Sequence, residues 1–155
     1  MYLNQRKAFT MLELTFVIVI IGILSAVAIP KFAANRDDAT ISKAKTTVAA
    51  VRNAVSTERQ KRILRGSFTP ITKLSAASGA DKPIFDGFEG NVSNTVLEYP
   101  LHSCKTGAKG CWLQNAAGTE YTYALPVSGS VIFELKNNKF NCKDKTKANC
   151  KLLTQ

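Results

Sequence analysis

The sequence predicts an α+β fold in which a long N-terminal helix packs on a small antiparallel β-sheet, and disulfides close loops near the C-terminus. Three observations support this prediction: a charge-free apolar run from Leu14 to Ile29, a helical pattern of apolar residues after it, and short alternating segments in the second half. With 155 residues, the chain is long enough for one domain and an appendage, and too short for two full domains.

The apolar run predicts the transmembrane half of the long helix. Residues 9–30 in α-helical conformation extend about 33 Å, which is enough to cross a hydrocarbon core of about 30 Å. The positive charges of Arg6 and Lys7 precede the run. Positive charge on that flank keeps an N-terminus in the cytoplasm, so we expect the rest of the chain on the other side of the membrane.

Residues 31–65 are predicted to continue the helix as its amphipathic half. Apolar residues recur there at spacings of three and four, which places them on one helical face: Ile41, Ala44, Val48, Val51 and Val55. Basic residues crowd the end of this segment and Gly66 follows it. Both features are typical of a helix C-terminus.

Residues 66–155 are predicted to form a globular head. The stretch 66–94 is rich in Gly, Ser, Pro and Asp, so we expect a long connecting region there. Alternating patterns with aromatic and β-branched residues predict strands at 96–101, 111–114, 119–127 and 130–135. We expect these strands to form an antiparallel sheet that packs on the apolar face of the helix.

All four cysteines lie in the final third of the chain: Cys104, Cys111, Cys142 and Cys150. An even number of cysteines behind a membrane-targeting segment favours disulfides in an oxidising compartment. Paired zinc ligands are usually about two to four residues apart, and these cysteines are further apart, so a zinc site is the weaker alternative. We expect nearest-neighbour pairs, although the sequence alone leaves the two crossed pairings open.

The segment from Lys7 to Leu14, followed by the apolar run and Pro30, resembles the N-terminus of type IV prepilins and of the pseudopilins of type II secretion. The resemblance implies that a prepilin peptidase cuts off a leader of residues 1–8 between Ala8 and Phe9. It also implies that the same enzyme methylates the new Phe9 amine. Ala8 departs from the family pattern, which nearly always has Gly at this position.

Glu13 places a carboxylate at the start of the apolar run. Such a group costs about 2.5–3.5 kcal/mol on insertion scales, so an intramembrane acid is by default functional. The resemblance implies that Glu13 pairs with the Phe9 amine of a neighbouring subunit during filament assembly. The alternative is a carboxylate that reaches the lipid headgroups or carries a proton.

Gly22 and Pro30 are candidate helix-breaking positions. The resemblance implies that the helix between two such positions can melt in a filament. The alternative is that both residues are harmless, since membrane helices tolerate Gly and Pro.

The resemblance implies a structural subunit of a filament that serves DNA uptake, type II protein secretion or surface pili. Its expected partners are the prepilin peptidase, other pilin or pseudopilin subunits and the inner membrane. The head is expected in the periplasm before the subunit enters a filament. One alternative is a soluble periplasmic protein, because the residues from Ala26 to Ala28 match the A-x-A site of a cleaved signal peptide.

An enzyme is disfavoured by the sequence, because the lone His102 has no Ser or Cys nucleophile motif near it. No cofactor is expected. Asp81, Asp86 and Glu89 lie in the connecting region, where secretion pseudopilins bind calcium, but they lack regular ligand spacing. We therefore expect no metal either.

The basic C-terminal end is a candidate DNA contact. With a net charge of +10, the chain can attract DNA phosphates, anionic lipid or an acidic partner. A disulfide between the last two cysteines would display Lys143, Lys145 and Lys147 on one constrained loop. Lysines held in this way can neutralise phosphates without reading bases. The alternative is that they form a solvated face of the head.

Overall fold

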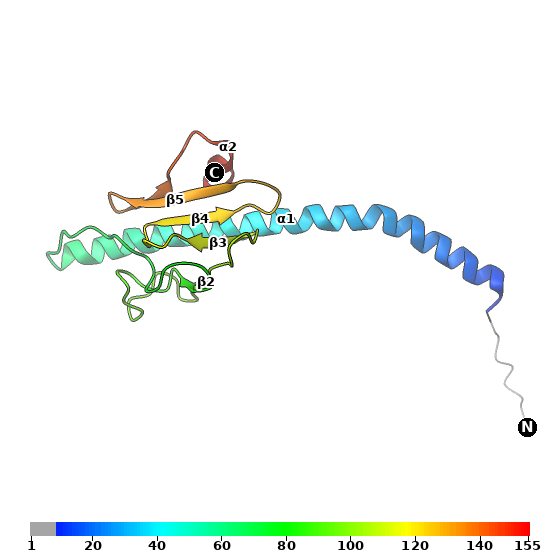
Figure 1. The fold of residues 1–155 in the computed structure, drawn as a ribbon, viewed down its shortest axis with the longest axis horizontal. Coiled ribbons are helices and arrows are strands. Elements are labelled where there is room, and N and C mark those ends of the chain that lie inside the picture. Colours follow the sequence, from blue (N-terminus) through cyan, green and yellow to red (C-terminus); the bar gives the residue numbers. More distant parts are fainter. Residues whose placement is uncertain (1–8) are drawn as a thin grey trace, which may run out of the picture. The chain divides into compact units, whose positions relative to one another are not determined.

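The computed structural model describes residues 9–155, so the predicted leader of residues 1–8, including Ala8, lies outside the described part of the chain. The chain is divided into two compact units, with the boundary between Arg36 and Asp37. One long helix, α1 (Met11–Leu64), supplies the first unit and continues into the second, which also holds the strands and a short helix, α2 (Ala148–Thr154; Figure 1). The α+β prediction is confirmed.

The first unit is the apolar part of α1. Its large apolar side chains, from Phe9 to Phe32, are exposed. By length and composition, α1 is the one described helix that could cross a membrane, although a signal sequence would meet the same criteria. The helix is continuous through Gly22 and Pro30, and a methyl group added at Gly22 would meet no atom within 4 Å. Melting between these two residues therefore stays a prediction about the assembled filament.

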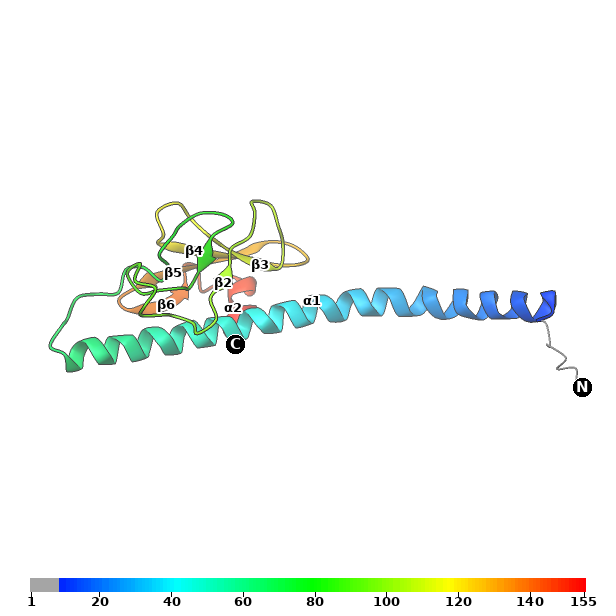
Figure 2. The ribbon, with the colours of Figure 1, turned by 90° about the horizontal axis from the view of Figure 1, so that it is seen from below.

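The core of the second unit lies between the amphipathic part of α1 and a four-stranded sheet (Figure 2). Four residues of the predicted apolar face, Ala44, Val48, Val51 and Val55, are at most 2% exposed. Ile41 packs against the edge of this core. The helical spacing of these residues thus correctly predicted the face that is buried.

The chain leaves α1 through a left-handed glycine. Gly66 has φ of 75°, its N–H donates to the carbonyl of Ile63 at 2.9 Å, and the Ser67 N–H donates to the carbonyl of Arg62 at 2.9 Å. These two bonds form a Schellman motif, which satisfies carbonyls that the last turn leaves without partners. The predicted helix C-terminus at Gly66 is confirmed.

The main sheet is antiparallel, with its strands in the order in which they occur along the chain: β3 (Cys111–Gln114), β4 (Glu120–Ala124), β5 (Ser130–Lys136) and β6 (Lys139–Cys142). The predicted strands at 111–114 and 130–135 are β3 and β5, whereas β4 is shorter than predicted. Side chains alternate between the core and solvent. Aromatic residues supply most of the buried face: Trp112, Tyr121, Tyr123, Phe133 and Phe140.

Strand β6 was not predicted from the sequence. Asn137 and Asn138, with φ of 53° and 58°, connect it to β5 in a two-residue turn of the type that suits hairpins. The side-chain oxygen of Asn138 also accepts a hydrogen bond from the backbone N–H of Ile71 at 2.7 Å. Asparagine tolerates this backbone conformation, so the Asn-Asn pair was the signal for a turn.

The predicted strand at 96–101 is wrong in extent. Only its last residue belongs to a strand, β2 (Leu101–His102), which pairs with β1 (Pro83–Ile84). Pro100 has no N–H to donate to a ladder, and the N–H of Leu97 donates instead to the carbonyl of Phe85 at 3.1 Å. The connecting region is also packed rather than loose, since Leu74 and Phe85 have no exposed surface.

Both disulfides have the nearest-neighbour pairing that we expected. Cys104 is bonded to Cys111, and Cys142 is bonded to Cys150, with Cα–Cα distances of 6.0 and 6.1 Å. The loop closed by Cys142 and Cys150 ends in a short helix, because α2 (Ala148–Thr154) begins just before Cys150. This helix forms because Leu153 and Cys150 become buried on the head, at 2% and 4% exposure.

Candidate functional site

At the start of α1, Thr10 and Glu13 form a reciprocal capping box. Oε2 of Glu13 accepts hydrogen bonds from the backbone N–H of Thr10 at 2.8 Å and from its Oγ1 at 2.9 Å, while the Thr10 Oγ1 accepts from the Glu13 N–H at 3.2 Å. Such bonds satisfy N–H groups that the first helical turn leaves without partners. The role of Thr10 as a helix cap was not predicted from the sequence, although the T-x-x-E pattern from Thr10 to Glu13 is typical of a capping box.

The capping box holds the Glu13 carboxylate in one orientation while leaving part of it available. Oε1 receives no hydrogen bond from residues 9–155, and the side chain is exposed. Phe9, the residue expected to become the new N-terminus, is 82% exposed. This arrangement can therefore offer a carboxylate oxygen to a cation of another molecule without uncapping the helix.

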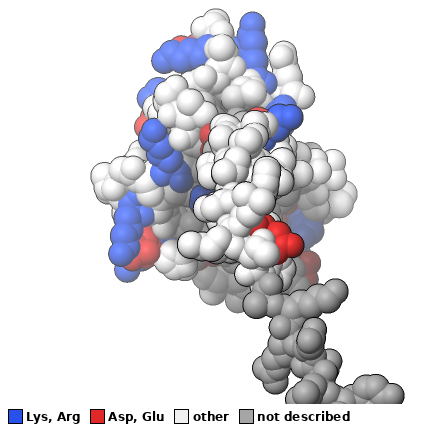
Figure 3. Space-filling model, turned by 90° about the vertical axis from the view of Figure 1, so that its right-hand side faces the viewer, with Lys and Arg blue, Asp and Glu red and all other residues white. Residues whose placement is uncertain are grey.

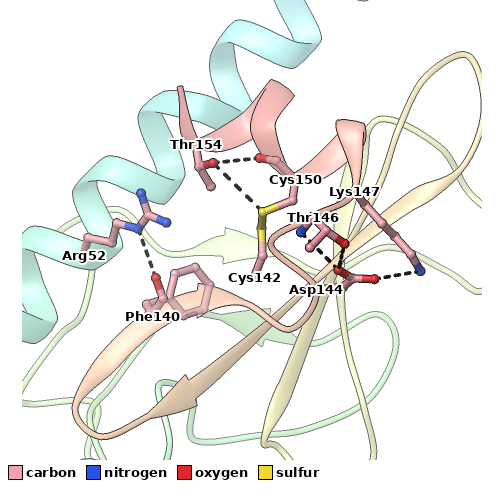
Figure 4. Close-up of a disulfide and its surroundings, with 8 residues drawn as sticks. All are labelled: Arg52, Phe140, Cys142, Asp144, Thr146, Lys147, Cys150 and Thr154. Carbon is pink, nitrogen blue, oxygen red and sulfur yellow. Dashed lines mark hydrogen bonds and ion pairs between the residues drawn. A yellow bond between two sulfur atoms is a disulfide. The ribbon is translucent and has the colours of Figure 1, made fainter.

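The loop closed by Cys142 and Cys150 does not present three unpaired lysines. Nζ of Lys143 donates to Oε1 of Glu120 at 2.5 Å. Figure 4 shows the second pair, in which Nζ of Lys147 lies 3.6 Å from Oδ2 of Asp144. Lys145 is exposed and forms no ion pair with another described residue. The structure thus places the three predicted lysines on one loop, but two of them already have carboxylate partners.

The ion pairs on this loop also affect its titration. The hydrogen bond to Glu120, and then the charge of that carboxylate, raise the pKa of the Lys143 ammonium. Two hydrogen bonds from Thr146 lower the pKa of Asp144, with a smaller effect from the charge of Lys147. Both changes stabilise the charged forms, so Lys143 and Asp144 are both charged at neutral pH. Counterions for these two lysines are therefore supplied by the chain itself.

One face of the head carries its positive charge at several separate places. On the face drawn in Figure 3, Lys and Arg side chains lie at several separate places, and acidic side chains lie among them. A polyanion would therefore need a local group of cations without neighbouring carboxylates. The net charge alone identifies no such group.

The acidic residues of the connecting region bind backbone and hydroxyl groups. Oδ1 of Asp86 accepts from the Ala76 N–H at 2.9 Å, and the two oxygens of Glu89 accept from the N–H and Oγ1 of Thr72 at 2.7 and 2.6 Å. Asp81 lies 3.6 Å from the exposed His102. Within residues 9–155, no three His, Cys, Asp or Glu side chains form a group that could hold a metal ion.

A second ionic cluster, which the sequence reasoning missed, ties the end of α1 to the connecting region. Nε of Arg62 lies 3.0 Å from Oε1 of Glu58, and Nη1 of Arg62 lies 3.6 Å from Oε1 of Glu89. Burial raises the pKa of Glu58, but hydrogen bonds from Arg62 and Asn94 more than offset this effect and lower it. Because all these cations and carboxylates are paired with one another, this cluster has a structural role.

Comparison with known proteins gives two kinds of match. The family described as "Prokaryotic N-terminal methylation motif" matches residues 3–29. The type IV major fimbrial protein FimA of Dichelobacter nodosus is 31% identical over 162 aligned residues, which cover 93% of this chain and 99% of that protein. Similarity therefore extends from the N-terminal motif through the head.

Two further relatives match over shorter stretches. A fimbrial protein of Moraxella nonliquefaciens is 38% identical over 96 residues, or 62% of this chain, and the match spans 57% of that protein. The type II secretion system core protein G of Escherichia coli is 36% identical over 52 residues, which are 34% of this chain and 36% of that protein. No solved structure matches the chain significantly.

Proposed function

The chain belongs to the type IV pilin and pseudopilin family, and on this premise we propose that it is a structural subunit of a type IV pilus-like filament, with no enzymatic role. The observation that supports this role most directly is the exposed apolar part of α1 with one carboxylate, Glu13, held at its first turn. A surface of this kind needs lipid or the helices of other subunits around it.

The proposed maturation starts at the N-terminus. A prepilin peptidase removes residues 1–8 between Ala8 and Phe9 and methylates the Phe9 amine. Residues 9–30 then cross the inner membrane, residues 31–65 form the amphipathic part of the helix, and residues 66–155 form the head in the periplasm. The chain is later extracted from the membrane into the filament.

Glu13 is proposed to guide assembly. A carboxylate in hydrocarbon is costly unless it is paired, and cleavage creates a positive amine on Phe9 of each incoming subunit. Oε1 of Glu13, which receives no hydrogen bond from residues 9–155, is available for that amine, while Oε2 stays bonded to Thr10. The gain on pairing two charges in an apolar environment would favour addition of one subunit beside another.

Gly22 and Pro30 are proposed to let the helix adapt in the filament. Pro30 removes one backbone hydrogen bond, and Gly22 lowers helix stability by about 1 kcal/mol relative to Ala. The helix between these positions is therefore the part of α1 that unwinds at the lowest cost. Packing against neighbouring subunits would select the unwound form.

A surface pilus is the machine that the relatives favour. The match that covers nearly all of this chain is to a major fimbrial protein, whereas the secretion protein matches about a third of it. DNA uptake is a second candidate, because of the net charge of +10. In that role Lys145, together with Lys143 and Lys147 if their carboxylate partners yield, would contact phosphates.

Filament incorporation of a Glu13→Val variant tests the assembly role. The variant is expected to insert into the membrane and to be cleaved like the unmodified chain, because removal of an acid makes insertion easier. It should then be absent from filaments sheared off the cell surface, which should contain the unmodified chain. Normal incorporation of Glu13→Val, alone or mixed with the unmodified chain, would rule out the pairing role.

A further inference from the structure

A groove runs between α1 and the turn that joins β5 to β6. Its volume is about 580 Å³, and no carboxylate of the described residues lines it. The lining includes two guanidinium groups, one ammonium group and several amides: Arg52, Arg59, Lys139, Gln60, Asn137 and Asn141. This groove belongs wholly to the second unit, and none of its lining residues lies in the loop closed by Cys142 and Cys150.

The two arginines of the groove are held in place by backbone carbonyls. Nε of Arg52 donates to the carbonyl oxygen of Phe140 at 3.0 Å (Figure 4), and Nη1 of Arg59 donates to the carbonyl oxygen of Thr69 at 3.2 Å. A guanidinium has five N–H donors, so each arginine keeps donors for a ligand. The bonds to the carbonyls orient these groups before any ligand arrives.

The cations of the groove differ from several other cations of the head in whether they have a carboxylate partner. Lys143 is paired with Glu120 and Lys147 with Asp144, and Arg62 lies between two glutamates. By contrast, Arg52, Arg59 and Lys139 form no ion pair with any described residue. The charge of Arg52 is half-buried, so an anion in the groove would compensate it in a partly desolvated site.

We propose that this groove binds the phosphate backbone of duplex DNA without reading its sequence. Arg52 and Arg59 are seven residues apart on α1, which corresponds to about 10.5 Å along the helix axis. Each strand of duplex DNA carries one phosphate per about 3.4 Å of duplex axis, so two cations at this separation can contact different phosphates. The guanidinium fork suits phosphate oxygens, and the amides add further N–H donors.

The lining favours a duplex over a single strand. Single-stranded nucleic acid is usually held by aromatic rings on which bases stack. The one aromatic residue of the groove, Phe140, is 1% exposed, so its ring is not available. The proposal goes beyond filament assembly, because a chain that cannot assemble would still carry the groove.

Anisotropy of a short labelled duplex, titrated with the full chain in a non-ionic detergent, tests the proposal. Binding is expected at about 50 mM salt and should weaken steeply towards about 200 mM. The double variant Arg59→Gln with Lys139→Gln should bind several-fold more weakly. It should also lower the slope of log affinity against log salt by about 1.8, since each lost phosphate contact removes about 0.9.

A matched control removes the same charge elsewhere. Lys82→Gln with Lys105→Gln neutralises two exposed lysines outside the groove and should change the salt slope by less than half as much. The thermal unfolding midpoint of each variant checks that the head is intact, and the single variant Lys139→Gln keeps the test valid if the double variant unfolds. Loss of binding confined to the groove variants would support the proposal.

Three results would overturn it. The first is an absence of salt-dependent binding at low salt, and the second is an equal loss in the control variant. The third is a larger loss from Lys143→Gln with Lys145→Gln, which would assign phosphate binding to the lysine loop. Sedimentation without DNA measures self-association as one more check. If the groove variants self-associate less but bind DNA with unchanged affinity, the groove binds an acidic surface of a second copy instead of DNA.

Discussion

Thr10 and Glu13 cap each other at the first turn of α1. Thr10 donates two hydrogen bonds to one oxygen of the Glu13 carboxylate and accepts one from the Glu13 N–H, at distances between 2.8 and 3.2 Å. The residue proposed to pair with a neighbouring subunit is thus held by a residue of its own chain. Its orientation before assembly depends on a single hydroxyl and a single backbone N–H.

Replacement of Thr10 should therefore weaken assembly without abolishing it. In Thr10→Val the carboxylate loses the hydroxyl bond, and loss of a helix cap costs about 1 kcal/mol. We expect a lower yield of sheared filaments at an unchanged amount of membrane-inserted, cleaved subunit. Thr10→Ser, which keeps the hydroxyl, is the control and should restore the yield. A filament yield of Thr10→Val equal to that of the unmodified chain would show that capping is irrelevant to assembly.

The mature chain is expected to begin at Phe9 with a methylated amine. The intact mass of membrane-extracted protein should show the loss of residues 1–8 and the gain of one methyl group. Because Ala8 stands where the family has Gly, Ala8→Gly should be cleaved at the same bond at least as fast, which a pulse-chase experiment measures. A mature chain that begins at Ile29 would instead identify a conventional signal peptide.

Loss of the Cys142–Cys150 disulfide should destabilise the head more than loss of the Cys104–Cys111 disulfide. Closing a loop of this size stabilises by about 2.5 kcal/mol in the chain-entropy model, which corresponds to a melting-temperature shift on the order of 10 °C. Cys142 and Cys150 are each 4% exposed and also anchor α2, whereas Cys104 and Cys111 are half-buried.

Paired Cys→Ser variants of each bridge, melted in parallel, measure this difference. The less buried Cys104–Cys111 bridge should also be reduced first by a thiol reagent, because access limits thiol–disulfide exchange. Equal melting temperatures for the two variants, or prior reduction of the Cys142–Cys150 bridge, would contradict the ranking. Peptide mapping without reduction checks the pairing itself.

Tyr121→Phe should lower the free energy of unfolding by about 1–3 kcal/mol. The Tyr121 hydroxyl accepts from the buried N–H of Leu74 at 2.9 Å and donates to the carbonyl oxygen of Gly118 at 3.2 Å. Removal of the hydroxyl leaves that N–H unsatisfied in the core, which chemical denaturation would detect. Tyr99→Phe is the control, since Tyr99 is 83% exposed and its replacement should have no effect.

The same tyrosine predicts how stability changes at high pH. Burial raises the pKa of Tyr121 to about 12, from an ordinary value of 10.0. Between these two values the folded chain holds a proton that the unfolded chain has lost, so stability is unaffected below pH 10 and falls as pH rises towards 12. Unfolding midpoints measured across this range should decline less in Tyr121→Phe than in the unmodified chain. Identical declines would assign the alkaline loss to other groups.

Patterns in the sequence correctly predicted the features that depend on neighbouring residues. These features are the apolar run, the buried face of α1 with Val48 and Val51, and the end of the helix at Gly66. Each can be recognised from the geometry of an α-helix, which rises about 1.5 Å per residue and repeats about every 3.6 residues. Short loops between cysteines also favoured the pairing observed. Each of these signals is complete within a few turns of chain, so no knowledge of distant residues was needed.

Contacts between residues far apart in the sequence could not be predicted and follow from the folded chain. Lys143 pairs with Glu120, 23 residues away, and Arg52 reaches the carbonyl of Phe140, 88 residues away. The lysines of the loop therefore looked unpaired in the sequence, and the groove beside α1 was not visible there. The physical reason is that a charge acquires its partner, and an edge strand such as β6 its neighbours, only when the sheet closes over the helix.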